Sequence, residues 1–254
     1  MKPLSVARDL QRRRARERTG LFSAEGVRCV EELLASPLRI RSVITAPALL
    51  ETDRGAALHA ALASAASGRG FDLAEATDQA LASAASTDST QGIIAIGEHP
   101  ERSFENIADD GHILVLDGVQ DPGNVGTILR TAQAFGVAAT IALPGTADLW
   151  NPKVVRSAMG ALFSHVAFSA GSTETMEYLR ARSLPIWATS AAGEPITNVS
   201  GERSVVIVVG NEANGVSQVI AKAATRTVAI PIRGVESLNV AVATGIILFA
   251  MTTA

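Results

Sequence analysis

The sequence predicts an α/β fold in two parts, a small N-terminal unit over residues 1–97 and a C-terminal domain over residues 112–254. The chain has 254 residues, of which 47% are hydrophobic and 19% charged, so it fits one large or two small domains and can bury a core. From residue 113 onward, short apolar runs alternate with helical segments, which is typical of strands buried on both faces of a mostly parallel sheet. The polar stretch 98–111 contains Pro and two Asp residues and predicts the linker.

The N-terminal unit is expected to begin with a helix, a turn and a second helix. Arg8–Arg18 predicts the first helix, which Thr19 and Gly20 end, and Glu25–Leu34 predicts the second. Five further elements complete this unit: a strand at Ile40–Thr45, a helix at Gly55–Ala66, a strand at Phe71–Ala74, a helix at Thr77–Ala85 and a strand at Ile93–Gly97.

The C-terminal domain is expected to form an open sheet with helices on both faces. Its predicted strands are Ile113–Asp117, Ala138–Leu143, Ser164–Phe168, Ile186–Ser190, Val205–Val209 and Thr227–Ile230. Its predicted helices are Val125–Phe135, Pro152–Gly160, Thr173–Ala181, Val216–Ala223 and Leu238–Met251.

Composition excludes several classes of protein. The single cysteine, Cys29, rules out a disulfide scaffold and a cysteine-based zinc cluster, and its place on a predicted helix favours a core position. The N-terminus is basic and polar, unlike a secretory signal. The longest apolar stretch near the C-terminus, Leu238–Met251, is too short to cross a bilayer of about 30 Å. We therefore expect a soluble, cytoplasmic protein with no membrane partner.

The charge is distributed unevenly along the chain. The net charge is −3, but residues 1–41 hold ten Lys or Arg and five Asp or Glu, whereas the remainder holds twelve and twenty. Arginine binds phosphate through a bidentate fork, so an arginine-rich segment favours a nucleic-acid interface over a merely solvated helix face. The candidate RNA-binding residues are Arg8, Arg12, Arg13, Arg14, Arg16 and Arg18.

Three loops at predicted strand ends are rich in Gly and polar residues. They are residues 118–126, 210–217 and 233–239, and the first enters a helix that carries Arg130. Ligands of open α/β sheets bind at the carboxyl ends of strands, and glycine-rich loops expose backbone N–H groups there. These loops are alternatively ordinary turns, in which Asn124 and Ser237 are only helix N-caps.

The sequence lacks the motifs of common nucleotide-binding and metal-binding sites. The loops contain neither the G-x-G-x-x-G pattern of a dinucleotide site nor the pattern of a phosphate-binding P-loop. The four histidines have no metal-ligand spacing, and we expect no metal cofactor. For Trp150 and Trp187, core packing is the default interpretation.

Taken together, the three loops resemble the motifs of the SpoU/TrmH family of RNA ribose 2′-O-methyltransferases, in the SPOUT superfamily. Residues 117–136 (DGVQDPGNVGTILRTAQAFG), 208–217 (VVGNEANGVS) and 230–250 (IPIRGVESLNVAVATGIILFA) resemble its three motifs in the correct order. Residues 20–26 and 90–95 resemble the family's L30e-like substrate-binding domain. The resemblance covers nearly the whole chain and extends to the two-domain branch that includes 23S ribosomal RNA methyltransferases and the thiostrepton-resistance methyltransferase.

The resemblance implies a fold, a cofactor and an assembly. The C-terminal domain would form a deep trefoil knot, an exception to the rule that chains are unknotted. The protein would bind S-adenosylmethionine and methylate a ribose 2′-hydroxyl of structured RNA, with ribosomal RNA as the expected substrate. It would act as a homodimer with sites completed across the interface.

The resemblance also carries site residues onto this sequence. The implied catalytic residues are Arg130, Asn124, Glu212, Ser237 and Asn239. The implied cofactor-binding residues are Pro144, Gly145, Thr189, Ser190, Gly210, Asn211, Gly215, Ile230, Ile232 and Leu238. Family members are proposed to activate the 2′-hydroxyl with the arginine, as a base. Because arginine is effectively never deprotonated, a cationic fork that binds phosphate and stabilises the developing alkoxide is the physically sounder role for Arg130.

Three alternatives stand beside this interpretation. The first alternative is an enzyme that methylates transfer RNA. The second is a non-catalytic RNA-binding or ribosome-assembly protein on the same fold. A nucleotide-dependent oxidoreductase on an ordinary Rossmann sheet is the third, and the missing G-x-G-x-x-G pattern counts against it.

Overall fold

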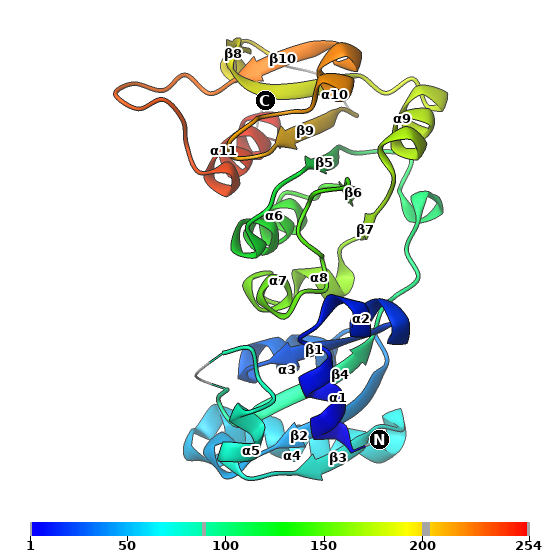
Figure 1. The fold of residues 1–254 in the computed structure, drawn as a ribbon, viewed down its shortest axis with the longest axis vertical. Helices are drawn as coiled ribbons and strands as arrows, with labels where there is room; N and C mark the ends of the chain where they lie inside the picture. The colour runs from blue at the N-terminus through cyan, green and yellow to red at the C-terminus, as the bar shows by residue number, and fades with distance from the viewer. Residues whose placement is uncertain (1, 88–89, 200–203, 253–254) are drawn as a thin grey trace. The chain divides into compact units, whose positions relative to one another are not determined.

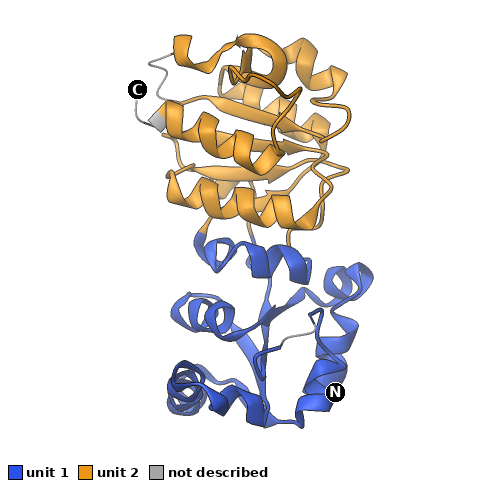
Figure 2. Cartoon of the chain, turned by 90° about the vertical axis from the view of Figure 1, so that its left-hand side faces the viewer, with its two compact units in different colours: residues 1–101, 150–164 blue, residues 102–149, 165–254 orange. Residues whose placement is uncertain are grey.

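A computed structural model of the chain describes residues 2–87, 90–199 and 204–252, which form two compact units. Unit 1 comprises residues 1–101 and 150–164, and unit 2 comprises residues 102–149 and 165–254 (Figure 2). The segment 150–164, which we expected in the C-terminal domain, thus groups with the N-terminal unit.

Unit 1 is built on a four-stranded sheet in the order β1-β4-β2-β3. The strands are β1 (Leu21–Glu25), β2 (Ile40–Thr45), β3 (Asp72–Glu75) and β4 (Ile93–Glu98), and only the β2–β3 pair is parallel (Figure 1). Its helices are α1 (Pro3–Asp9), α2 (Arg13–Thr19), α3 (Val27–Ala35), η1 (Pro47–Glu51), α4 (Asp53–Arg69), α5 (Asp78–Ala82), α7 (Pro152–Ser157) and α8 (Ala161–Ser164).

The predicted N-terminal helix, turn and helix are partly wrong. The expected helix Arg8–Arg18 is interrupted between α1 and α2, and Glu25 lies in β1, before the second helix. Strand β1 escaped prediction because four of its five residues are buried, so the segment shows no alternation of apolar and polar residues. The strand Ile40–Thr45 is confirmed residue for residue.

The segment 150–164 packs into unit 1 through aromatic and polar contacts. The ring of Phe22 in β1 lies 4.6 Å from that of Trp150 and 5.6 Å from that of Phe163, centroid to centroid. The guanidinium of Arg156 lies 3.7 Å from the carboxylate of Glu25, which is buried. Residues that neighbour the C-terminal motifs in sequence are therefore part of the N-terminal core, which no local pattern indicates.

Cys29 occupies the core position that the sequence predicts. Its side chain is buried in α3, with Sγ 3.9 Å from the carbonyl oxygen of Val155. Burial raises the pKa of the Cys29 thiol to about 12, so the thiol stays protonated and unreactive at neutral pH.

Unit 2 is built on a six-stranded sheet in the order β10-β8-β9-β5-β6-β7, and every strand pair is parallel. Its strands are β5 (Ile113–Asp117), β6 (Ala139–Ala142), β7 (Ala167–Ser169), β8 (Ile186–Pro195), β9 (Val206–Gly210) and β10 (Arg226–Ala229). Its helices are η2 (Phe104–Asn106), α6 (Pro122–Ala134), α9 (Ser172–Ala181), η3 (Ile196–Asn198), α10 (Gln218–Ala223) and α11 (Val240–Thr252).

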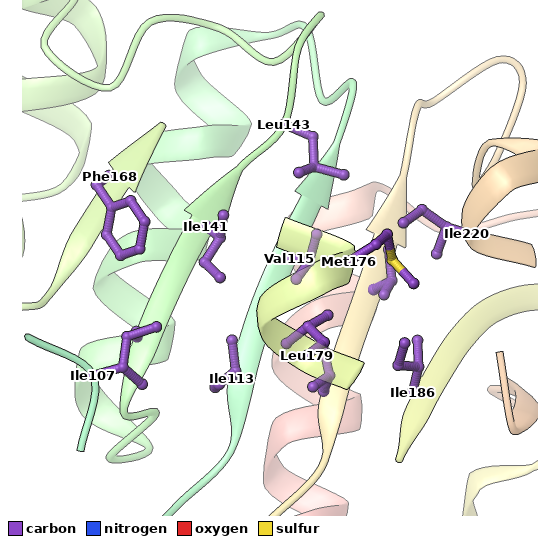
Figure 3. Close-up of a cluster of buried hydrophobic side chains, with 13 residues drawn as sticks. Ile107, Ile113, Val115, Ile141, Leu143, Phe168, Met176, Leu179, Ile186 and Ile220 are labelled. Atoms are coloured by element: carbon purple, nitrogen blue, oxygen red, sulfur yellow. The ribbon is translucent and has the colours of Figure 1, made fainter. Parts of the chain in front are cut away.

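Apolar side chains fill both faces of this sheet, as the continuous apolar runs predict. On one face, Met176 and Leu179 of α9 lie over Val115 and its neighbours (Figure 3). Helix α11 packs against α6 (Figure 1). Ile107, inside the predicted linker, also joins the buried cluster. The predicted strand Ser164–Phe168 starts later, at Ala167, because residues 161–164 are helical.

Helix α11 is almost wholly apolar and has 13 residues. Among the residues that the structure describes, no helix combines the length and the apolar character needed to cross a membrane.

Strand β8 contains an irregularity that the sequence did not reveal. Ala188 pairs with Thr227, but the next residue of β10, Val228, pairs with Glu194. Residues 189–193 therefore arch away from the edge strand before the pairing resumes. Gly193 closes this arch, because a Cβ atom there would lie 2.5 Å from the backbone carbon of Val228. The predicted strand Ile186–Ser190 accordingly continues to Pro195.

Candidate active site

A pocket of about 480 Å³ lies at the carboxyl ends of β8, β9 and β10, beside the start of α11. This is the edge at which open parallel sheets bind ligands. Its lining includes eight of the ten residues expected to bind a cofactor: Thr189, Ser190, Gly210, Asn211, Gly215, Ile230, Ile232 and Leu238. Three residues expected to be catalytic, Glu212, Ser237 and Asn239, also line it.

Pro144 and Gly145 are not among the lining residues, and both are exposed. They follow β6, which is separated from β9 by β5 in the sheet order. The carboxyl end of β5 lies between this segment and the ends of β8, β9 and β10, so the assignment of Pro144 and Gly145 to the cofactor site stays a prediction.

The loop after β9 is held in a fixed shape. Asn211 and Gly215 form two backbone hydrogen bonds that close the loop, and the Asn211 side chain donates to the carbonyl of Gly118 at 2.9 Å. Gly210 is required where this loop folds back, since a Cβ atom would lie 2.2 Å from the backbone carbon of Gly215. This wall of the pocket is therefore formed before any ligand binds.

The loop between β10 and α11 forms a second wall of the pocket and, unlike the loop after β9, is not closed by backbone hydrogen bonds to described residues. Residues 231–238 make no backbone hydrogen bond to any described residue. Their polar backbone groups are therefore free to bind a ligand, while Ile230, Leu238 and Ile247 supply apolar surface to the pocket. Free backbone polar groups beside apolar side chains suit a molecule that carries both a flat heterocycle and an amino-acid tail, as S-adenosylmethionine does.

The arch of residues 189–193 in β8 supplies the third wall, because Thr189, Ser190 and Ala191 line the pocket. The irregular pairing with β10 thus makes room for a ligand at the sheet edge. The sequence predicted Thr189 and Ser190 through the family resemblance alone.

One chain of hydrogen bonds joins the three loops. The Asn124 amide donates to Oε1 of Glu212 at 3.1 Å, and the Asn239 amide donates to Oδ1 of Asn124 at 3.0 Å. The backbone N–H of Gln120 approaches the other oxygen of Glu212 at 3.4 Å. Asn124, Glu212 and Asn239, which are far apart in the sequence, are therefore adjacent in the structure.

These contacts hold the Glu212 side chain as a carboxylate. Partial burial acts to raise the pKa of Glu212, but hydrogen bonds from its own backbone, the Asn124 amide and the backbone of Gln120 and Asp121 outweigh it. The pKa of Glu212 therefore lies below its ordinary value. At neutral pH Glu212 is an ionised acceptor that orients Asn124.

Asn124 and Ser237, which the sequence offered as possible helix N-caps, do not cap the helices. Asp121 caps α6 by accepting from the backbone N–H of Asn124 at 2.9 Å, so Asn124 is not the cap. Asn239 accepts from the backbone of Ala241 at 2.9 Å at the start of α11, and Ser237 lies outside the helix. The side chains of Asn124 and Ser237 are thus not consumed by capping.

Arg130 lies on α6 and stands apart from this hydrogen-bonded chain. Its side chain is exposed and forms no hydrogen bond or ion pair with any described residue. An exposed guanidinium on the helix that carries Asn124 is available to a ligand from outside the chain.

The arginines of the N-terminal segment differ in their surroundings. Arg16 is only 2% exposed and donates to the backbone carbonyl of Leu10 at 2.7 Å, so its assignment to an RNA-binding surface was wrong. Arg8 donates to Ser83 at 2.8 Å, and Arg13 pairs with Glu17. Three of the predicted residues are exposed and have no partner among the described residues: Arg12, Arg14 and Arg18.

His165 illustrates a buried histidine with a structural environment. Its Nε2 lies 2.8 Å from the hydroxyl of Thr140, and burial, aided by Arg102, lowers its pKa to about 4. The imidazole is therefore neutral at physiological pH. Among the residues that the structure describes, no three His, Cys, Asp or Glu side chains are grouped as metal ligands are.

The parallel sheet, its pocket and the joined loops define an α/β protein with a small-molecule site at the strand ends. The family model of the SpoU rRNA methylase family matches residues 111–249 of the sequence. The family model of the MRM3-like substrate-binding domain matches residues 5–95. The chain belongs to the SpoU rRNA methylase family.

Known proteins resemble the chain over nearly its whole length. The 23S rRNA (guanosine(2553)-2′-O)-methyltransferase RlmP of Bacillus subtilis is 31% identical over 247 residues, 94% of this chain and 92% of that protein. The structure of an AdoMet-bound rRNA methyltransferase from Sinorhizobium meliloti has a TM-score of 0.83 and 29% identity, covering 98% of this chain and 94% of that one.

The orientation of the Asn124 amide gives a sharp test of the site. In Asn124→Asp the donor to Glu212 is replaced by a second carboxylate, so the pKa of Glu212 should rise through like-charge repulsion. We expect methyl transfer to fall by about tenfold to a hundredfold, the effect of one unmade hydrogen bond at such a site. The loss should lessen as the pH falls, because protonation of either carboxyl restores a donor.

The matched control is Gln133→Glu, which makes the same change of amide to carboxylate at an exposed position of α6. Rates measured from pH 5 to pH 8 on both variants, with thermal unfolding as a check of folding, decide the matter. An Asn124→Asp enzyme as active as the control at every pH would contradict the role assigned to this amide.

Proposed function

We propose that the chain transfers the methyl group of S-adenosylmethionine to the 2′-hydroxyl of a ribose in ribosomal RNA. The observation that carries the proposal is the hydrogen-bonded chain of Glu212, Asn124 and Asn239 beside a pocket with free backbone groups. Family membership supports it, as do relatives that are named 23S rRNA 2′-O-methyltransferases. With such a substrate, we propose a cytoplasmic location for the protein.

Some of the site residues would hold the cofactor, and others would activate the ribose hydroxyl. When bound, S-adenosylmethionine supplies an electrophilic methyl group on a sulfonium that leaves as a neutral thioether. The pocket loops hold one reactant, and fixed placement of two reactants contributes roughly 7–11 kcal/mol to lowering a barrier. No metal is required for this chemistry, because the cofactor carries its own leaving group.

Arg130 is the residue that we assign to the hydroxyl. A guanidinium stays protonated at neutral pH, so it stabilises the alkoxide that develops as the hydroxyl loses its proton, and it binds a neighbouring phosphate. Glu212 positions Asn124, and Asn124 and Asn239 each keep one amide N–H that makes no contact with a described residue. These N–H groups and the Ser237 hydroxyl are placed to bind the target nucleotide.

A homodimer is the second part of the proposal. Helix α11 exposes Val242 (53%), Ile246 (39%) and Phe249 (56%), and their spacing puts them on one helix face. Exposed apolar side chains grouped in this way mark a protein interface, and a second copy of the chain offers the same apolar face. The helix that carries Arg130, α6, packs against α11, so this interface would bring Arg130 close to the partner subunit.

The trefoil knot belongs to the same proposal. After the edge strand β10 the chain returns to the middle of the sheet, where α11 contacts α6, β9 and η3. To form a knot, the C-terminal segment has to pass through the loop made by an earlier part of the chain, and this return places α11 beside the segment that follows β8.

The activity itself is tested by removing Arg130. We expect Arg130→Ala to keep the fold and S-adenosylmethionine binding but to lower methyl transfer at least about a hundredfold, the range for one oxyanion-stabilising donor. Transfer is measured as labelled methyl incorporated into 23S ribosomal RNA and, in parallel, into transfer RNA.

Arg180→Ala serves as the control for Arg130, since Arg180 is also exposed and lies on another helix of unit 2. Full activity in Arg130→Ala would refute the assignment. A wild-type protein that binds RNA without methylating either substrate would instead favour the assembly-factor alternative.

RNA binding by unit 1 is tested through the three unpartnered arginines. Replacing Arg12, Arg14 and Arg18 with Gln should weaken binding and flatten the slope of log K against log salt by about 2–3, since each phosphate contact adds nearly one. The control replaces Arg39, Arg41 and Arg54, which already pair with carboxylates, and removes the same charge. Equal slopes for the two triple variants would mean that the arginines of this segment form a solvated helix face and do not bind RNA.

The dimer is tested by placing a charge on α11. Wild-type protein should sediment at twice the chain mass of 26.3 kDa, and Phe249→Glu should sediment as the monomer with its helical content retained. The control Val219→Glu changes a comparably exposed apolar residue on α10 and should remain dimeric. A monomeric wild type, or a dimeric Phe249→Glu variant, would overturn this part of the proposal.

A further inference from the structure

The charged residues that line the pocket all have the same sign. Two acidic residues, Glu212 and Glu236, line it, and no Lys, Arg or His is among the lining residues. Arg233 lies only three residues before Glu236 but is outside the lining. A ligand inside the pocket therefore meets uncompensated negative charge from the chain that forms it.

The two carboxylates are not equivalent. Glu212 accepts hydrogen bonds from Asn124 and from the backbone of Gln120, so both of its oxygens are occupied in holding the loops. Glu236 forms no hydrogen bond or ion pair with any described residue, and it directly precedes Ser237 and Leu238 in the pocket wall. Glu236 is thus the carboxylate whose oxygens are free to contact a ligand.

The cofactor and its product differ in charge at one atom. S-adenosylmethionine carries a sulfonium, an ammonium and a carboxylate, for a net charge of about +1, whereas the product thioether has lost the sulfonium charge. In the transfer the carbon–sulfur bond breaks, the carbon–oxygen bond forms, and the positive charge leaves as the hydroxyl proton. A nearby carboxylate therefore stabilises the bound substrate form more than the product form.

We propose that Glu236 is a specificity-determining residue that favours the sulfonium form of the cofactor over the demethylated product. This inference rests on the proposed function. Its consequence is that the spent cofactor is released more readily and inhibits the enzyme less. Because the loop of Glu236 is exposed, the preference is small, about two- to fivefold, as for charge interactions near water.

The test compares ligands of different charge on the full-length protein. Calorimetric titration gives dissociation constants for S-adenosylmethionine, for sinefungin, which carries an amine where the sulfonium stands, and for S-adenosylhomocysteine. In Glu236→Gln the two cationic ligands should lose about two- to fivefold in affinity, while S-adenosylhomocysteine should change little. Glu236→Asp should retain most of the preference, because it keeps the charge.

Two comparisons separate the proposal from its rivals. Glu177→Gln removes an exposed carboxylate of α9 that does not line the pocket and should leave all three constants unchanged. Raising the salt concentration should lessen the preference in the wild type but not in Glu236→Gln. The thermal unfolding of each variant checks that it is folded.

The outcomes are distinct. If the wild type binds all three ligands and Glu236→Gln keeps the same ratio of constants, Glu236 has no role in recognising charge, while the proposed function stands. If the wild type binds none of them, the proposed function fails, and this inference fails with it.

Discussion

The amide of Asn124 is the contact on which the site depends. It is the middle of a hydrogen-bonded chain whose ends, Glu212 and Asn239, belong to loops about 90 and 115 positions further along the sequence. An amide is the one side chain of this size that both donates and accepts at neighbouring atoms, so neither Asp nor Leu could join the same two partners. Because Asn239 also caps α11, the orientation of this amide links the start of α6 to the start of α11. The proposed catalytic arginine, on α6, and the pocket wall before α11 are therefore positioned by one small polar group.

The pocket itself follows from a departure from regular sheet pairing. A parallel edge strand normally continues in register, which would leave no room between β8 and β10. Here residues 189–193 arch out of the ladder, and Gly193 allows the strand to return against the backbone of Val228. The wall formed by the loop before α11 complements this arch, because its backbone groups have no partner among the described residues. A rigid loop after β9 and an open loop after β10 together give a site with fixed shape on one side and free hydrogen-bonding capacity on the other.

The sequence predicted the fold class and most strands because their signals are local. Ile113–Asp117 is an apolar run that ends in Asp117, and Ile40–Thr45 is rich in β-branched residues; both are strands with the predicted bounds. The loops were predicted through their Gly and Asn content, and seven of the site residues predicted within them line one pocket. What failed depended on contacts between distant residues. Arg16 looks like its neighbours in the sequence but is buried against Leu10, and the segment 150–164 groups with the N-terminal unit, which no local pattern reveals.

The aromatic residues limit how this protein can recognise RNA. Single-stranded RNA is usually held by stacking of bases on exposed aromatic rings. Here the rings pack against one another, as in the cluster of Phe22, Trp150 and Phe163 and in that of Phe104, Phe168 and Tyr178. Among the described residues, Phe249 is the aromatic side chain with more than a third of its surface exposed, and it belongs to the apolar face of α11 assigned to the dimer. We therefore expect binding to come from the arginines and from backbone groups, which would contact phosphates and riboses and not base faces. The ribose 2′-hydroxyl lies on that same sugar–phosphate backbone, so an enzyme that binds phosphates would already be close to its target atom, and we expect the shape of the RNA to contribute more to recognition than base stacking.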